Sequence, residues 1–442
     1  MPDTSSSLSV IALLGYLVIV DLTVLFLYVL LGFFLAQTMP ATYAILRRNF
    51  TGYFNNPTGY VFLIVFVILT CAAAFCTDEF FNTNLANLDQ LNYWLPAVLL
   101  VFIPSITMSI WAQEQQQGTD ELLLTLPATD FDVVLGKYLA AVGIYTVSLL
   151  FSHASNFTVL AILSEGDVDL GLFTSTYIGY WFVGLAMLSL GMVCSFLTSN
   201  LTIAFISGAM INAPFALASV IGTTIPGLLF FVTQDSAGTQ AFTKWGYYEQ
   251  FASFGRGVIS LGSVVYFLMI TVTGIYLSLA FLGQRHWATP RSGKDELLRI
   301  GLGYGLTAFR YLILLLMVVG VLMQYDLATV AIGALWIALL LGLAYLFVVS
   351  KPEAPPMLEH HFVRFLTLVL IMIGVSSVLS TRDIRFDLTQ GRISSLSPET
   401  VKLIEDLDGT RPVIIEAYIG NKIPEPYVKT RYDLITMLNE IQ

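Results

Sequence analysis

The sequence predicts an α-helical membrane protein that crosses the bilayer about ten times. Of its 442 residues, 56% are hydrophobic and only 11% are charged, whereas soluble domains carry roughly 25% charged residues. Apolar runs of about 20 residues, the length of a membrane-spanning helix, recur along the chain. These runs lie at 8–36, 58–77, 93–111, 134–163, 172–198, 200–232, 259–282, 303–324, 327–349 and 363–380.

Two of these runs have features of their own. The run at 8–36 is about twice as long as the apolar core of a signal peptide and follows no basic segment, so we expect a retained transmembrane helix. The run at 200–232 contains Pro214 and Pro226. Because proline interrupts helices, we expect one span there, followed by a re-entrant or interfacial piece.

The loops between the runs fall into two sets by charge. Loops rich in Lys and Arg stay on the cytoplasmic side of a membrane. One set holds Lys244 and Arg256 as its only basic residues and is therefore expected outside. We thus expect a multi-pass protein of the cytoplasmic membrane, with its amino terminus and the segment after residue 380 outside. The loops expected inside, with their flanks, are 37–57, 112–133, 283–302 and 350–362, which hold Arg47, Arg48, Lys137, Arg285, Arg291, Lys294, Arg299, Lys351 and Arg364.

Composition and motifs exclude several classes of function. The formal net charge of −10 argues against a nucleic-acid partner, because such a partner needs basic patches. Neither the three cysteines nor the four histidines have the spacing of a metal site. No GxxxxGK[ST] phosphate-binding loop occurs. We therefore expect no catalytic residues, no metal and no cofactor in this chain, and no ATP hydrolysis by it.

A polar segment with many leucines, WAQEQQQGTDELLLTLPATDFDVVLGKYLAA, separates the third and fourth runs. Gly118 permits a sharp turn, and Pro127 prevents a helix from continuing. Between them we predict a two-turn helix over 119–126, with Thr119 as its cap. A second capping motif at Thr129 predicts the start of the next span.

The leucines of this short helix lie on nearly every side of it and need a covering surface. A helix of two turns is unstable alone in water. The charges of Asp120 and Glu121 disfavour insertion of this helix into the hydrocarbon part of the bilayer. Two interpretations remain open, a helix at the membrane interface or a docking element for a cytoplasmic partner protein. The leucines are Leu122, Leu123, Leu124 and Leu126.

This segment resembles the cytoplasmic segment of ABC-2 type transporter permeases. The resemblance covers about 41–287 and rests on an acidic residue, a Gly-Thr-acid-acid-Leu-Leu run, a Leu-x-x-Pro-like element and a Leu-Gly-Lys. It implies a six-span core whose coupling helix, near 119–127, sits in a groove of a separate ATPase subunit that binds ATP and Mg²⁺. The matching residues are Glu114, Gly118, Thr119, Asp120, Glu121, Leu122, Leu123, Leu126, Pro127, Leu135, Gly136 and Lys137; Leu124 belongs to the same docking element.

Three polar residues are predicted to lie within the membrane. Asp21 belongs to an extra helix, residues 1–40, that lies outside the six-span pattern. An intramembrane acid is a functional candidate, and the alternative is a hydrogen bond to a neighbouring helix. His153 and Asn156 share one span, where they either line a pathway or form interhelical hydrogen bonds.

An aromatic stretch precedes the seventh run and contains Arg256 among Tyr248, Phe251 and Phe254. Aromatic residues gather at membrane interfaces, so one interpretation is an interfacial belt. The other is a functional element, either an outer gate or the contact with an outer domain. The sequence does not decide between them.

The carboxyl-terminal part changes in composition. Two further spans and linkers are expected over 288–362, and the last span over 363–380. Residues 381–442 carry 18 charges in 62 residues and are expected to form a short extracytoplasmic α/β segment with the order helix, strand, helix. One strand cannot bury two helices, so we expect this domain to be incomplete here or to be completed by another chain.

The tail contains RFDLTQGRISSLS, which resembles the start of the auxiliary extracytoplasmic protein of gliding-motility-type ABC systems. In that family an Arg-x-Asp-Leu-Thr run follows one span, and a Ser-Leu-Ser follows the run. The resemblance implies a fusion of a permease with the start of an auxiliary, substrate-binding-like domain. The matching residues are Arg385, Asp387, Leu388, Thr389, Ser395 and Ser397.

Together the resemblances imply a transporter membrane subunit that is not itself an enzyme. It would form a homodimer with two ABC-type ATPase subunits and serve export or envelope- or motility-related work, with a further chain completing the auxiliary domain. The alternative is a mechanotransmission or scaffold complex, in which the ATPase moves the outer domain without substrate passage. A secondary transporter is a third interpretation, but intramembrane acids are few and no inverted repeat is visible.

Overall fold

The structure, a computed structural model, describes residues 4–76, 86–164, 168–218, 245–283 and 385–389, with a few isolated positions outside these ranges. The predicted spans at 303–324 and 327–349 lie outside the described residues. So do Ser395, Ser397 and, apart from isolated positions, the helix–strand–helix pattern of the tail. The last predicted span, 363–380, is also described only at isolated positions.

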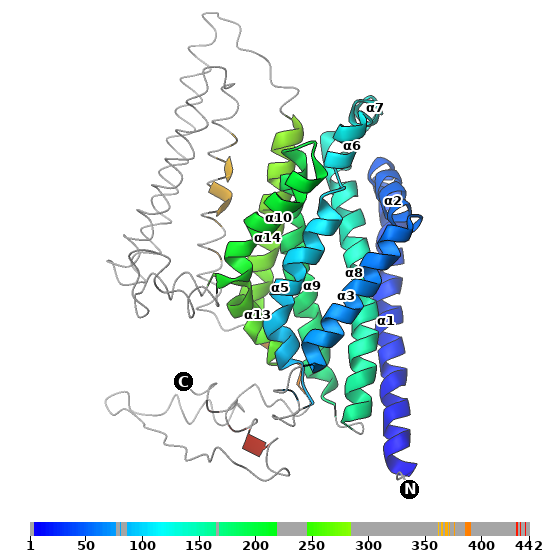
Figure 1. Ribbon diagram of the computed structural model, residues 1–442, viewed down its shortest axis with the longest axis vertical. Coiled ribbons are helices and arrows are strands. Elements are labelled where there is room, and N and C mark those ends of the chain that lie inside the picture. Colours follow the sequence, from blue (N-terminus) through cyan, green and yellow to red (C-terminus); the bar gives the residue numbers. More distant parts are fainter. Residues whose placement is uncertain are drawn as a thin grey trace, which may run out of the picture.

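Long helices run roughly side by side and form a bundle (Figure 1). Each of the seven apolar runs predicted between residues 8 and 282 overlaps one helix. Within the described residues, five helices are long and apolar enough to cross a membrane, or up to six if the bent pair α2–α3 forms one span. The helices in these runs are α1 (Thr4–Thr38), α3 (Pro57–Phe75), α5 (Asp89–Thr107), α8 (Asp130–Leu163), α9 (Leu170–Phe196), the shorter α10 (Leu201–Ala216) and α14 (Leu261–Gly283).

Shorter elements mark the two ends of the bundle (Figure 1). We call one the α7 end, because α2, α6 and α7 lie there, and the other the α13 end, where α13 and the beginning of α1 lie. The chain passes from one end of the bundle to the other with each of α3, α5, α8, α9 and α14 (Figure 1). The shorter helices are α2 (Pro40–Phe54), α6 (Ala112–Gln117), α7 (Asp120–Leu124) and α13 (Tyr247–Gly255).

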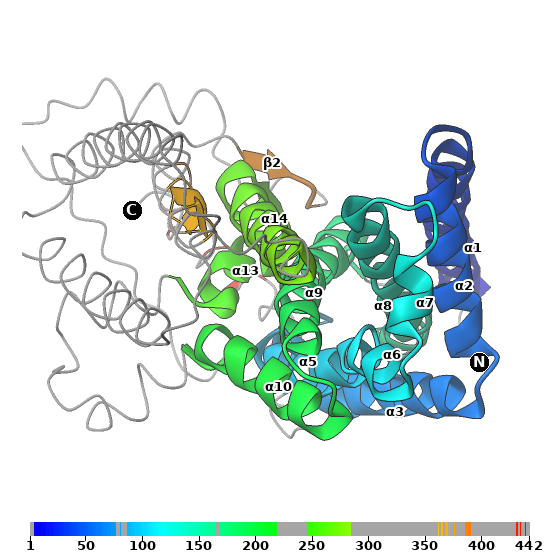
Figure 2. The same ribbon diagram turned by 90° about the horizontal axis from the view of Figure 1, so that it is seen from above.

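Helix α9 lies in the middle of the bundle and packs on α5, α8, α10, α13 and α14 (Figure 2). Small residues allow this close packing, as is common between membrane helices. Gly184 faces the ring of Tyr145, whose hydroxyl donates a 2.8 Å hydrogen bond to the carbonyl of Tyr180. On α14, a Cβ at Gly274 would lie 2.8 Å from the carbonyl carbon of Ser189.

Helix α1 lies at the edge of the bundle, where it packs on α2 and α8. Only 6% of its most apolar stretch is buried, although Leu17 and Leu35 are buried against its neighbours. The hydroxyl of Tyr28 donates a 2.7 Å hydrogen bond to the carbonyl of Leu139 on α8. The large exposed apolar surface of α1 is what a helix that contacts lipid requires.

Helix α2 lies across the α7 end and meets α3 at an angle of 75°. It begins at Pro40, a favourable first position for proline. It approaches α8 closely at Gly136, where a Cβ would lie 2.8 Å from the carbonyl oxygen of Thr42. The hydroxyl of Thr42 also donates a 2.7 Å hydrogen bond to Asp132. These contacts bring Arg48 of α2 next to the segment between α5 and α8.

Two short strands pair at the α13 end, and the sequence analysis predicted neither. Strands β1 (Val258–Ser260) and β2 (Arg385–Asp387) are antiparallel, with Ile259 opposite Phe386. Strands of three residues are too short to show the alternation of polar and apolar residues by which strands are recognised. The pairing nevertheless joins the start of the tail to the transmembrane core.

We expect the substitution Gly274→Ala to destabilise the protein. The new Cβ would overlap Ser189 and push α14 away from α9, and overpacking of this kind costs about 1–3 kcal/mol. The melting temperature of the detergent-solubilised protein measures the effect. Gly15→Ala on α1 is the matched control, because a Cβ there meets nothing within 4 Å. Equal melting temperatures of the two variants would contradict the close packing of α9 and α14.

Candidate functional site

The α6–α7 segment is a helical hairpin at the α7 end of the bundle. Gly118 ends α6 in a left-handed conformation with φ of 67°, which glycine adopts without steric cost. The amide of Thr119 then donates a 3.0 Å hydrogen bond back to the carbonyl of Glu114. A sharp turn at Gly118 is therefore confirmed, and it sets α7 at an angle to α6.

Helix α7 is shorter than predicted. It spans Asp120–Leu124, five residues, instead of 119–126. Thr119 occupies the cap position, but its side chain makes no capping hydrogen bond and is directed to the carbonyl of Glu114 instead. The predicted capping motif of α8 is confirmed, since Thr129 and Asp132 form a reciprocal capping box.

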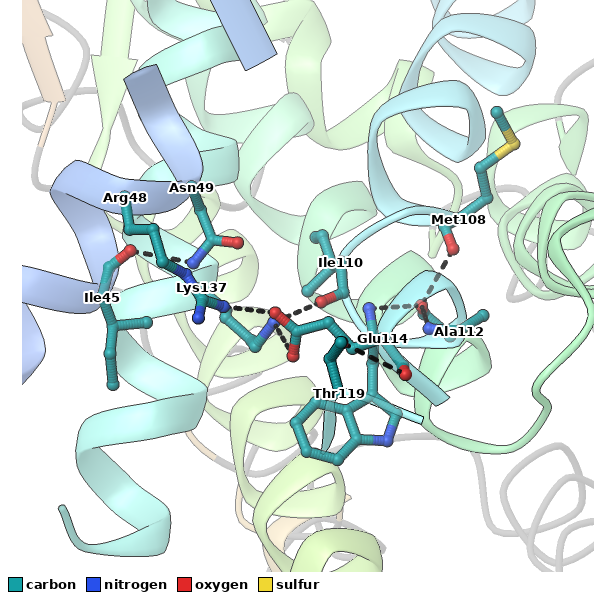
Figure 3. Close-up of polar contacts among 11 residues, drawn as sticks. Ile45, Arg48, Asn49, Met108, Ile110, Ala112, Glu114, Thr119 and Lys137 are labelled. Atoms are coloured by element: carbon teal, nitrogen blue, oxygen red, sulfur yellow. Dashed lines mark hydrogen bonds and ion pairs between the residues drawn. The ribbon is translucent and has the colours of Figure 1, made fainter. Parts of the chain in front are cut away.

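A buried lysine anchors this hairpin to α8. The side chain of Lys137 is 1% exposed, and its Nζ lies 2.8 Å from Oε2 of Glu114 on α6. The same ammonium donates a 2.6 Å hydrogen bond to the carbonyl of Ile110 and lies 5.3 Å from the centre of the Trp111 ring. Figure 3 shows Lys137 directed between Ile110 and Glu114.

Glu114 joins three helices through its carboxylate. Its Oε2 pairs with Lys137 of α8, and its Oε1 pairs with the guanidinium of Arg48 of α2 (Figure 3). Removing a lone charge from water is costly, so a buried ammonium needs such a partner. The two cations hold one carboxylate from different sides. As a result, α6 is fixed to both α2 and α8.

Ser195 fixes the end of α5 and the start of α6 to α9. Its Oγ accepts hydrogen bonds from the amides of Trp111 and Ala112, each 3.1 Å long, and donates to the carbonyl of Met108. The Trp111 ring stacks on Phe196 with ring centres 4.8 Å apart. The backbone groups left free between the end of α5 and the start of α6 are therefore satisfied by α9, as helix ends require.

The leucines of α7 and its end do not all face the same way. Leu123 is only 3% exposed and belongs to the core, whereas Leu122 is 72% exposed and Leu126 is 52% exposed. Leu124 is half-buried, and Pro127 is exposed. The face of this segment that is open to a partner therefore contains Leu122 and Leu126. Leu123 is used inside the protein and is not available for docking.

The three predicted intramembrane polar residues lie among polar neighbours. Nδ1 of His153 on α8 lies 2.8 Å from Oδ1 of Asp21 on α1. Asn156 is fully buried and donates hydrogen bonds to Ser152, at 3.2 Å, and to Tyr177, at 2.8 Å. The His153–Asp21 pair joins α8 to α1, and the hydrogen bond from Asn156 to Tyr177 joins α8 to α9. For Asn156 this is the interhelical hydrogen bond that the sequence left open.

The aromatic stretch before α14 is mostly inside the protein. Phe251 is 3% exposed and Phe254 is fully buried, and both contact Gly179 of α9. Tyr248 is half-buried, and Arg256 is exposed. The two phenylalanines therefore hold α13 against α9. Tyr248 and Arg256 are the members of this group that reach the surface.

The described part of the tail motif lies next to this stretch. Arg385 and Asp387 belong to β2, and the amide of Leu388 donates a 3.0 Å hydrogen bond to the carbonyl of Gly257, just after Arg256. Thr389 is buried. The structure thus brings together the aromatic stretch and the tail motif. It places both far from the α6–α7 hairpin, at the opposite end of the bundle (Figure 1).

The residues of the α6–α7 hairpin were predicted from the sequence, but its ion pairs and hydrogen bonds to α2, α8 and α9 were not. In the sequence, Lys137 and Arg48 indicated only which loops lie on the cytoplasmic side, and no motif pointed to Ser195. Arg48 and Glu114 are separated by 66 residues, so no local pattern could pair them. Among the described residues, no three His, Cys, Asp or Glu side chains are placed to hold a metal ion.

One region of the chain resembles a known family. Residues 80–279 match the family model described as "ABC-2 family transporter protein". The matched stretch includes the α6–α7 hairpin, α8, α9, α13 and most of α14. No curated protein matches the chain. The match supports a membrane subunit of the ABC-2 permease type, and the apolar helices support a multi-pass membrane protein.

We expect Glu114→Gln to destabilise the protein strongly, because it leaves Lys137 buried without a counter-charge. Breaking a buried ion pair on one side costs about 3–5 kcal/mol. The melting temperature of the purified protein measures the loss. Glu121→Gln removes an exposed acid of the same hairpin and is expected to change little.

The double variant Glu114→Gln with Lys137→Met tests whether the loss of stability comes from the unpaired charge of Lys137 or from other effects of the Glu114 substitution. It removes both charges, so part of the lost stability should return. A double variant less stable than Glu114→Gln alone would contradict the assignment of Glu114 as the counter-charge of Lys137.

Proposed function

We propose that the chain is the membrane subunit of an ABC-2 type transporter, and that helix α7 docks on a separate ATPase subunit that binds ATP and Mg²⁺. The observation that carries this proposal is the α6–α7 hairpin. It combines an exposed apolar face at its tip with a buried ion pair at its base. The family match over residues 80–279 supports the class of protein.

The exposed face of α7 favours a protein partner over the bilayer surface. Asp120 and Glu121 directly precede Leu122, and α7 lies farther out along the bundle than α2 (Figure 1). A helix that rests in the membrane interface keeps its apolar side toward lipid and its acids away from it. At α7 the leucines and acids project together beyond the level of α2. A groove in a protein can accept both.

The base of the hairpin supplies a path for movement. A push on α7 reaches α6 through the turn at Gly118. From α6 it passes to α8 and α2 through Glu114, and to α9 through the hydrogen bonds of Ser195. Rigid helices carry such displacements as whole bodies. ATP binding in the partner would thus move α8 and α9, which form the centre of the bundle.

The assembly follows from the family resemblance. We infer a homodimer with two ATPase subunits in the cytoplasmic membrane, with the α7 end inside and the α13 end outside. The work is export or an envelope- or motility-related process. The tail motif at 385–389 supports a gliding-motility-type system whose outer auxiliary domain is completed by another chain.

A mechanotransmission complex is the second candidate, and the pairing of β1 with β2 favours it. In such a complex the ATPase moves an outer domain and no substrate passes. The pairing links the tail directly to the outer ends of α9 and α14. A continuous polar lining at the dimer interface would favour transport, and a dry, packed interface would favour mechanotransmission.

We expect the double substitution Leu122→Asp and Leu126→Asp to abolish recovery of the ATPase with the tagged chain. Burying each leucine contributes about 1.5–3 kcal/mol, so the ATPase-to-chain ratio should fall at least about tenfold. Quantitative mass spectrometry of the purified complex measures this ratio. Because both side chains are exposed in the isolated chain, its melting temperature should not change.

The control replaces the same two leucines with Met, which keeps an apolar surface of similar volume. This variant should retain the ATPase. The docking proposal fails if the Asp variant recovers as much ATPase as the Met variant does.

A further inference from the structure

The core holds the start of the tail in a strand-docking site at its α13 end. Ser260, Ile259 and Val258 of β1 pair in register with residues 385–387. The hydrogen bond from the amide of Leu388 to the carbonyl of Gly257 extends the ladder by one pair. We call β1 with Gly257 and Gly171 the strand-docking site, and residues 385–389 its occupant. Figure 2 shows β2 beside α14.

Two glycines give the site its shape. Gly257 has a φ of 85°, in the left-handed region, and a Cβ there would overlap the methyl group of Thr389. At the start of α9, a Cβ at Gly171 would overlap the carbonyl group of Leu388. Gly171 thus leaves room for the backbone of the extended segment, and Gly257 leaves room for the side chain of Thr389. Close approach of another backbone, as at Gly171, is a common reason for glycine at a fixed position.

The occupant closes its own end with a turn. Oδ1 of Asp387 accepts hydrogen bonds from the amide of Thr389, at 2.9 Å, and from its hydroxyl, at 2.6 Å. This is the local bonding by which Asp stabilises turns. Thr389 is only 6% exposed. The Asp and Thr of the Arg-x-Asp-Leu-Thr motif thus each have a structural role in fitting the segment to the site.

The receiving side is part of the central helices. β1 ends at Ser260, and α14 begins at the next residue. Oγ of Ser175 on α9 donates a 2.9 Å hydrogen bond to the carbonyl of Phe254 on α13, just before the site. The strand-docking site therefore cannot move without the outer ends of α9 and α14.

We propose that the strand-docking site is a permanent joint through which the outer tail moves together with α9 and α14. A two-stranded ribbon alone is marginally stable in water. Here the contacts at both glycines and the Asp387 turn add to the ladder. The joint makes residues 385–389 an extension of the core. The origin of the movement rests on the proposed function, whereas the docking of the segment rests on these contacts alone.

A disulfide across the ribbon tests the docking. Because Gly257 and Leu388 form a hydrogen-bonded pair, the alternation of an antiparallel ladder makes Ser260 and Arg385 a non-bonded pair with closer side chains. We replace both with Cys, after Cys71→Ala, Cys76→Ala and Cys194→Ala. Mild oxidation in membranes should cross-link most molecules.

The control is Ser260→Cys with Phe386→Cys in the same background. Neighbouring residues of a strand point to opposite faces, so Cys at these two positions cannot meet the geometry of a disulfide. Its yield should be at least about tenfold lower. Equal yields, or no cross-link in either variant, would overturn the strand-docking site.

The ATPase activity of the complex tests whether the joint is permanent. A cross-linked complex should hydrolyse ATP within about twofold of the rate of the same complex after reduction. Activity that is lost on cross-linking and restored by reduction would overturn a permanent joint, because the ribbon would then have to open during turnover. A chain that cross-links as expected but recovers no ATPase would refute the proposed function and leave the docking of the tail standing.

Discussion

The buried pair between Lys137 and Glu114 is the interaction on which the arrangement of the α7 end depends. An ammonium that is 1% exposed is unfavourable in a protein interior unless an anion and a hydrogen-bond acceptor meet it. Glu114 and the carbonyl of Ile110 do so, and both belong to the segment that turns from α5 into α6. Burying Lys137 therefore fixes the position of the hairpin, and with it the direction in which α7 projects.

The two ends of the bundle are specialised in different ways, and α9 connects them. At the α7 end, charges and a serine hydroxyl hold short helices in place. At the α13 end, glycines and backbone hydrogen bonds hold an extended segment. α9 contributes Ser195 to the first end and Gly171 to the second. A displacement of α9 would move the groups bound to it at both ends of the bundle. Both a transporter and a mechanotransmission complex require such coupling.

The helices and turns were predictable from the sequence, and the contacts between helices were not. The apolar runs predicted the long helices, and Gly118 and Pro127 predicted a short helix between turns, because these signals are local. The inward direction of Leu123 could not be predicted, since a leucine-rich helix has no polar face to orient it. The partners of Asp21 were equally hidden, because hydropathy does not tell which helices are neighbours.

Photo-crosslinking in native membranes tests most directly whether α7 faces a protein partner, as we propose. A photo-reactive amino acid at position 122 should form an adduct with an ABC-type ATPase, identified by mass spectrometry. The same group at the buried position 123 should form adducts only within the chain. Adducts from position 122 that contain lipid and no ATPase would contradict the claim and assign α7 to the membrane surface.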